Sequence, residues 1–322
     1  MKIFLRKIVL VFTFIVLKDI NARPISYPGG WTLMQANDFS KHSFIVHYSP
    51  SIDYSIGYRA EYWREKEWQF HGLQLNYLIK RINKPKSQTN FYLKNGIGLA
   101  TSNYEAFENK FEPSLFTGIL FDWEDRRFFT SYQNQANYAS SIDKFFSQQF
   151  RIGVAPYLAE YGYLHTWIML QANHMPGSRK NLTFTPMLRV FKGDYLAEFG
   201  LNNYKTLCLT SLKDFKGEEM KKIIIYLFIL QFVLFNSSKI LSDEQYNGDI
   251  LYVYVNGLVC DFCARSIEKI FSKQKSVAGI KVNLENMLIT INFKENQKLS
   301  YEKITEMIKD SGYDVREIKN VK

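Results

Sequence analysis

The sequence predicts two unlike domains: an N-terminal all-β antiparallel barrel of about ten strands and a C-terminal α+β domain with the ferredoxin-like order βαββαβ. Two observations support this division. Most of the chain alternates apolar and polar residues, whereas its last part combines such strands with helical spacing. Between them, a basic and then apolar segment begins at Met220. The length of 322 residues also exceeds the needs of one small domain.

Both parts of the chain are preceded by the pattern of a secretory signal peptide. Residues 1–22 have a basic start, an apolar stretch from Ile8 to Leu17 and a small residue at Ala22. Residues 216–242 repeat this design, with an apolar run shorter than the roughly 20 residues of a membrane-spanning helix. We therefore expect an internal signal-like segment, with a membrane anchor as second choice. The chain then joins two reading frames for two exported proteins; a genuine fusion is the alternative.

Residues 23–215 are predicted to form the barrel. In residues 54–62 aromatic and apolar residues alternate with polar ones, and polar turns such as Lys192-Gly193-Asp194 separate the runs. With its last strand ending on Phe215, this region resembles a bacterial outer-membrane β-barrel, which implies a membrane partner. A soluble lipocalin-like barrel or a sandwich is the alternative. Further alternating runs lie at residues 73–80, 90–101, 114–123, 127–137, 147–158, 163–174, 182–191 and 195–215.

Charge and polar residues give little sign of nucleic-acid binding or catalysis. The formal net charge of +10 lies mostly in the barrel region, whereas residues 243–322 hold about as many acids as bases. His165, His174 and Ser178 lie near expected strand ends, where histidines in the girdle of a barrel are ordinary. Cys208 lies in an expected strand as a small apolar thiol. We expect no enzyme and no nucleic-acid partner.

Residues 243–322 carry the signals of the second domain in order. Leu251, Val253 and Val255 alternate as a first strand, and Ile267, Ile270 and Phe271 follow at helical spacing. A second helix is expected to begin at the capping residue Ser300, with Ile304, Met307 and Ile308 on its inner face. The other predicted strands are residues 280–284, 287–293 and 313–318, the first two joined by the turn Glu285-Asn286.

Two cysteines, Cys260 and Cys263, lie three residues apart where the first strand of this domain meets its helix. Thiolates are soft ligands that select Cu(I), Zn(II) and similar ions. A helix N-terminus lowers the pKa of a thiol and so favours the ligating form. The spacing and its context therefore predict a metal-binding loop.

With this loop and the order of elements around it, residues 248–319 resemble the heavy-metal-associated domain family. That family includes copper chaperones, a periplasmic mercury-binding protein and modules of metal-pumping ATPases. The family loop Gly-Met-x-Cys-x-x-Cys falls on Gly257 to Cys263. The resemblance implies metal ligation by Cys260 and Cys263, with Cu(I) as first candidate and Hg(II) or Zn(II) as alternatives. It also implies a metal-transporting ATPase or another thiol acceptor as partner.

Three residues beside the loop follow from the same resemblance. Leu258 stands where the family has a buried methionine that supports the loop, and leucine preserves such packing. Tyr313 corresponds to the family's aromatic near the metal, or simply closes the core. Asp261 is expected to be a solvated loop acid; as a ligand it would favour Zn(II) over Cu(I).

A dithiol of this kind has other uses. A thioredoxin-like redox site has a tryptophan before its first cysteine and a later proline, whereas here Val259 precedes Cys260 and the last proline is Pro186. A structural disulfide would compete with metal binding. We therefore expect binding and transfer of a soft ion in the bacterial envelope, with the barrel in the outer membrane and the metal domain in the periplasm. A channel or structural barrel joined to a passenger metal module, or a redox dithiol, is the alternative.

Overall fold

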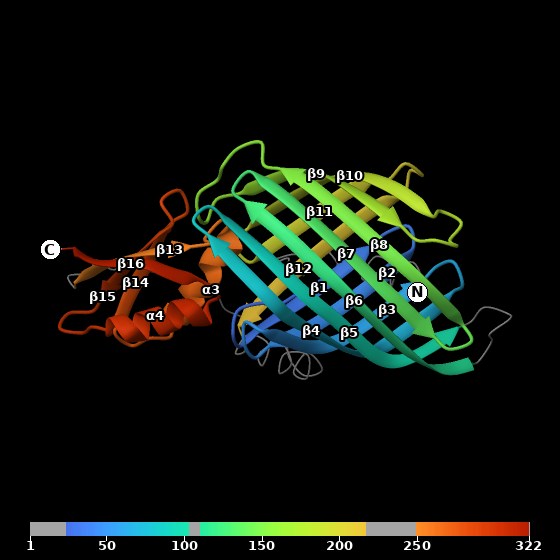
Figure 1. The fold of residues 1–322 in the computed structure, drawn as a ribbon, viewed down its shortest axis with the longest axis horizontal. Coiled ribbons are helices and arrows are strands. Elements are labelled where there is room, and N and C mark those ends of the chain that lie inside the picture. Colours follow the sequence, from blue (N-terminus) through green and yellow to red (C-terminus); the bar gives the residue numbers. More distant parts are fainter. Residues whose placement is uncertain (1–23, 103–109, 217–248, 322) are drawn as a thin grey trace, which may run out of the picture.

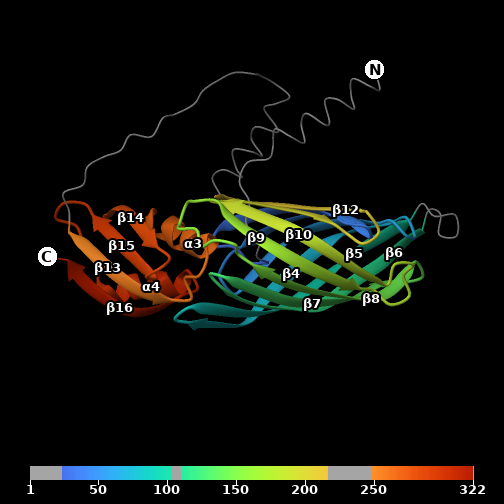
Figure 2. The ribbon, with the colours of Figure 1, turned by 90° about the horizontal axis from the view of Figure 1, so that it is seen from above.

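The structure is a computed structural model that describes residues 24–102, 110–216 and 249–321. The predicted signal peptide, residues 1–22, and residues 217–242 of the internal segment lie outside the described residues. A large barrel and a small α+β domain lie end to end (Figures 1 and 2).

The first domain is a closed barrel of twelve antiparallel strands in which β1 pairs with β12. The barrel strands are β1 Gly30–Asn37, β2 Lys41–Ser49, β3 Tyr54–Trp63, β4 Trp68–Lys84, β5 Ser87–Ser102, β6 Lys110–Asp125, β7 Phe128–Ala139, β8 Asp143–Val154, β9 His165–His174, β10 Leu182–Lys192, β11 Tyr195–Leu201 and β12 Leu207–Lys216. The barrel prediction is confirmed.

The predicted number of about ten strands is too low. The alternating runs identified in the sequence omit residues 30–49, which form β1 and β2. They also treat residues 195–215 as one run, although a turn divides it. The side chain of Asn202 accepts hydrogen bonds from the backbone N–H groups of Tyr204 and Thr206 at 3.0 and 2.9 Å, and this Asx turn reverses the chain between β11 and β12.

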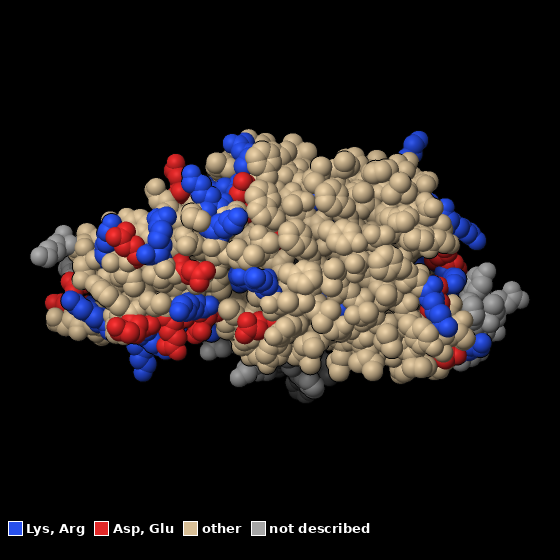
Figure 3. Space-filling view, in the orientation of Figure 1, with Lys and Arg blue, Asp and Glu red and all other residues tan. Residues whose placement is uncertain are grey.

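The barrel is apolar outside and polar inside. In β10, Leu182, Phe184 and Leu188 are exposed, whereas the polar residues at alternate positions, Thr183, Thr185 and Arg189, are buried. The same alternation along the other strands gives the barrel an apolar outer band. On the face shown in Figure 3, the charged residues lie towards the ends of the barrel and not on this band. This distribution is the reverse of a water-soluble protein, and an apolar band of this size marks a surface that meets lipid or another protein.

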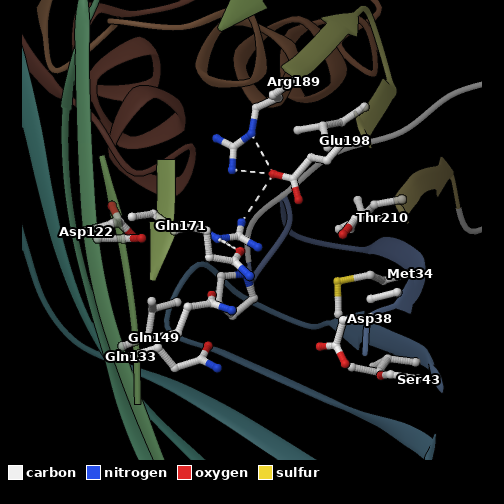
Figure 4. Close-up of a pocket in the computed structure, with 18 of the residues that line it drawn as sticks. Met34, Asp38, Ser43, Asp122, Gln133, Gln149, Gln171, Arg189, Glu198 and Thr210 are labelled. Carbon is white, nitrogen blue, oxygen red and sulfur yellow. Dashed lines mark hydrogen bonds and ion pairs between the residues drawn. The ribbon is translucent and has the colours of Figure 1, made fainter. Parts of the chain in front are cut away.

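Charged side chains cross the lumen. Glu198 accepts a hydrogen bond from Arg189 Nε at 2.8 Å (Figure 4) and another from Arg151 Nη1 at 3.2 Å. Elsewhere in the lumen, Arg59 Nη2 lies 2.6 Å from Glu61 Oε1. A cavity of about 250 Å³ remains among these groups. The lumen therefore holds a cavity that is lined by charged and by apolar side chains.

The second domain has the predicted order βαββαβ, and this prediction is confirmed. Its elements are β13 Ile250–Asn256, α3 Asp261–Phe271, β14 Val277–Asn283, β15 Leu288–Phe293, α4 Tyr301–Asp310 and β16 Asp314–Val321. They form an antiparallel sheet in the order β14-β15-β13-β16. The Ser300 hydroxyl accepts a hydrogen bond from Lys303 N at 3.2 Å and so caps α4.

The apolar faces of both helices close the core of this domain. Ile267 and Phe271 of α3 and Ile304 and Ile308 of α4 are all fully buried against the strands. Among the described residues, no helix is long and apolar enough to cross a membrane.

Candidate metal centre

The metal loop, residues Gly257 to Cys263, leads from β13 into α3. Gly257 has a φ of +82°, a conformation that favours glycine, and Val259 N donates to its carbonyl at 3.0 Å. Cys260 is the N-cap residue of α3 and Cys263 lies in the first turn of that helix. The structure describes the side chain of Cys260 but not that of Cys263.

Cys260 points into the barrel. Its side chain is buried, and Sγ donates to Oε1 of Glu124, on β6, at 3.6 Å. Cys260 lines the lumen cavity and also a second cavity of about 10 Å³, which it shares with Val259 and with His165 of β9. Cys260, a predicted metal ligand, therefore faces the lumen at the end of the barrel that contacts the second domain.

The turns that follow β4, β6, β8 and β10 form the end of the barrel to which the metal loop docks; we call this end the barrel mouth. Helix α3 lies against it in Figures 1 and 2. Lys269 Nζ lies 2.9 Å from Asp194 Oδ1. Glu160 Oε2 accepts from Leu284 N at 3.2 Å, and Gly312 O accepts from Asn83 Nδ2 at 3.1 Å.

Asp261 makes the most deeply buried of these contacts. Its Oδ1 accepts a hydrogen bond from Gly162 N at 2.6 Å and its Oδ2 accepts one from Gly193 N at 3.1 Å. Burial raises the pKa of Asp261 to about 6, although both hydrogen bonds act in the opposite direction. The expectation of a solvated loop acid is wrong, because Asp261 is 0% exposed and joins the two domains.

Leu258 and Tyr313 both lie in the core beneath the metal loop. They are 0% and 3% exposed and belong to the same apolar cluster as Cys260 and Val259. Leu258 therefore occupies a packing position, and Tyr313 closes the core from the start of β16. Whether either residue affects a bound metal stays a prediction.

The other polar residues noted in the sequence do not converge. His165 and His174 lie at opposite ends of β9, which puts them roughly 30 Å apart at the usual rise per residue. Ser178 Oγ donates to Glu65 Oε2 at 2.7 Å, and Cys208 is buried in β12. Among the described side chains, no three His, Cys, Asp or Glu residues form a metal site.

The sequence did not indicate that His165 lies close to the metal loop. The ring is buried and stacks on Phe191 with centroids 4.5 Å apart. It is hydrogen-bonded to the backbone of Glu160, while its Nε2 has no hydrogen-bond partner among the described residues. No sequence signal relates position 165 to position 260, because only domain docking brings them together.

Comparisons with known proteins match the two domains separately. Two solved structures of the KdgM porin, one in complex with disordered oligogalacturonate, are 7% and 8% identical with TM-scores of 0.37 and 0.36. Each match covers 58% of this chain and 98% of the porin.

The second domain matches both a family model and curated proteins. The model of the heavy-metal-associated domain matches residues 253–314. The copper chaperone CopZ of Staphylococcus haemolyticus is 33% identical over 64 residues, which are 20% of this chain and 93% of the chaperone. Copper-transporting ATPase 1 of Mus musculus is 39% identical over 62 residues, which are 19% of this chain and 4% of the ATPase. Through its second domain, the chain belongs to the heavy-metal-associated domain family.

Proposed function

We propose that the chain binds a soft metal ion through the thiolates of Cys260 and Cys263 and hands it on by ligand exchange. The observation that carries this proposal is the position of Cys260, as the N-cap of α3 in a βαββαβ domain of this family. The thiolates would lie at the positive end of the helix dipole, which favours the anionic, ligating form.

Cu(I) is the first candidate ion, because two thiolates satisfy a soft monovalent ion and similar proteins carry copper in their names. Hg(II) and Zn(II) are the alternatives. Two protein ligands leave a coordination position open, through which a thiol of an acceptor enters before the first ligands leave. A metal-transporting ATPase or another thiol protein would be the acceptor. Only metal–ligand bonds change, so the function is transfer and not enzymatic catalysis.

The barrel supports a location in the outer membrane of a bacterial envelope. Its outer surface exposes apolar side chains such as Leu73, Ile97 and Ile168, while Arg59 and Glu198 are buried inside. The metal domain would then lie in the periplasm. We retain residues 1–22 as a signal peptide, 23–215 as the barrel, 216–242 as an internal signal-like or anchor segment, and 243–322 as the metal domain.

Metal binding can be tested on the full chain in detergent, reduced and titrated with Cu(I) against a chelator. The expected result is one high-affinity ion per chain, lost in the double variant Cys260→Ser, Cys263→Ser and kept in Cys208→Ser, the control in the barrel. Unchanged affinity in the double variant would reject the proposal.

A second function rests on the lumen. The cavity of about 250 Å³, whose lining includes several charged side chains, would suit a passage for a small polar solute. Reconstitution into planar bilayers should then give ion conductance. Recovery of the barrel as a freely soluble monomer would favour the lipocalin-like alternative instead.

A further inference from the structure

The metal domain contacts the barrel around most of the circumference of its mouth. The barrel strands follow one another in chain order, so residues from successive turns lie at successive positions of the rim. Five such positions contact the metal domain: Lys84 at the end of β4, Glu124 near the end of β6, Gly162 before β9, Gly193 after β10 and Tyr27 before β1. The domain therefore covers the opening and does not lean on one side of it.

The metal loop lies across this opening. Gly257 N donates to Lys84 O at 3.0 Å, whereas Asp261, farther along the loop, is held by the segments that follow β8 and β10. Between these two anchors, Cys260 lines the lumen cavity together with Glu198. The loop therefore forms part of the wall of the lumen cavity at the mouth.

Helix α3 turns a polar face to the barrel. Asp261, Arg265, Glu268 and Lys269 recur at the spacing of one helix face, opposite the apolar face that packs in the domain core. The guanidinium of Arg265 lies 5.2 Å from the ring centroid of Tyr161, whose hydroxyl donates to Glu268. Polar interfaces of this kind between domains permit relative motion, whereas large apolar ones do not. The contact is therefore of a type that can open.

We propose that the docked metal domain is a plug that closes the lumen at the barrel mouth, and that its release opens the passage. This inference rests on the second proposed function, conduction through the lumen. The metal loop supplies the closing wall, and the polar face of α3 holds it in place. Because the same contacts bury Cys260, release exposes this thiol as well. An open lumen and an accessible metal loop therefore occur together.

The test records single-channel currents of the full chain in planar bilayers with potassium chloride. The wild type should be closed for most of the time. Asp194→Lys replaces an ion pair of 2.9 Å with two like charges at Lys269 and should raise the open time at least about tenfold, with an unchanged current through each open channel. Adding Lys269→Asp should restore most of the closure. The matched control is Asp249→Lys, which breaks an exposed ion pair with Lys298 at the start of β13 and should leave the open time as it is.

Labelling of Cys260 by a maleimide measures release independently, in a chain that also carries Cys208→Ser and Cys263→Ser. Asp261→Ala, which loses both hydrogen bonds to the barrel, is a second way to release the domain. Open time and labelling rate should rise together in Asp194→Lys and in Asp261→Ala. Faster labelling with the open time of the wild type would overturn the plug and leave the passage standing. Faster labelling without current in any variant would reject the passage, and the plug with it.

Discussion

Replacing Asp261 by Ala should release the metal domain from the barrel mouth. The substitution removes the acceptors of the partly buried N–H group of Gly162 and of the buried N–H group of Gly193, whose hydrogen bonds are 2.6 and 3.1 Å long. A hydrogen bond to a charged group contributes about 1.5–3 kcal/mol. The cost of burying the carboxylate, visible in its raised pKa, offsets part of this gain. We therefore expect docking to weaken by about 2 kcal/mol, or about 30-fold.

Thiol labelling of Cys260 measures this change directly. Cys260 is 4% exposed when docked, so a maleimide reagent reacts only with the undocked fraction. In a full chain that carries Cys208→Ser and Cys263→Ser, Asp261→Ala should raise the labelling rate by about 30-fold. Glu306→Ala, an exposed change on α4, serves as control. Equal labelling rates with and without Asp261→Ala would refute the view that these hydrogen bonds close the loop.

Three further predictions concern the two domains and their connection. Phe271→Ala, at a fully buried position of α3, should lower the free energy of unfolding of the metal domain by about 3–5 kcal/mol in denaturant titrations. Leu188→Arg, on the outer face of β10, should destabilise a barrel folded into lipid vesicles by about 2–4 kcal/mol, whereas a soluble barrel would tolerate it. If Met220 is a genuine start, antibodies against each half should detect two bands well below the 37.9 kDa of the whole chain; one full-length band would establish the fusion.

The second domain could be predicted almost completely because its signals are local. Alternation at Leu251, Val253 and Val255 and the cap at Ser300 act within a few residues, and each is present in the structure. The strands of the barrel were harder to predict, because the alternation of apolar and polar residues is less regular in some strands than in others. The strands β1 and β2 were missed, and the turn at Asn202 depends on side-chain hydrogen bonds that the alternation pattern does not reveal.

The surroundings of the metal loop could not be predicted, for a physical reason. Asp261 is held by the backbone N–H groups of Gly162 and Gly193, and every residue except proline has such a group, so the sequence does not mark these partners. His165 carried a faint signal, but as an isolated histidine at a strand end it indicated only a girdle residue. Only the structure shows that its Nε2 is buried without a hydrogen-bond partner among the described residues.

The docking of the two domains does not require one continuous chain. Among the described residues, the contacts that join the domains come from the barrel mouth, from α3 and from the segments that follow β14 and α4. Separate translation from Met220 would therefore leave every one of these contacts available to two proteins. In that case the metal domain should co-purify with the barrel, and Asp194→Lys should abolish the co-purification while the exchange with Lys269→Asp restores it. Failure to co-purify, together with two bands, would show that the two halves act apart.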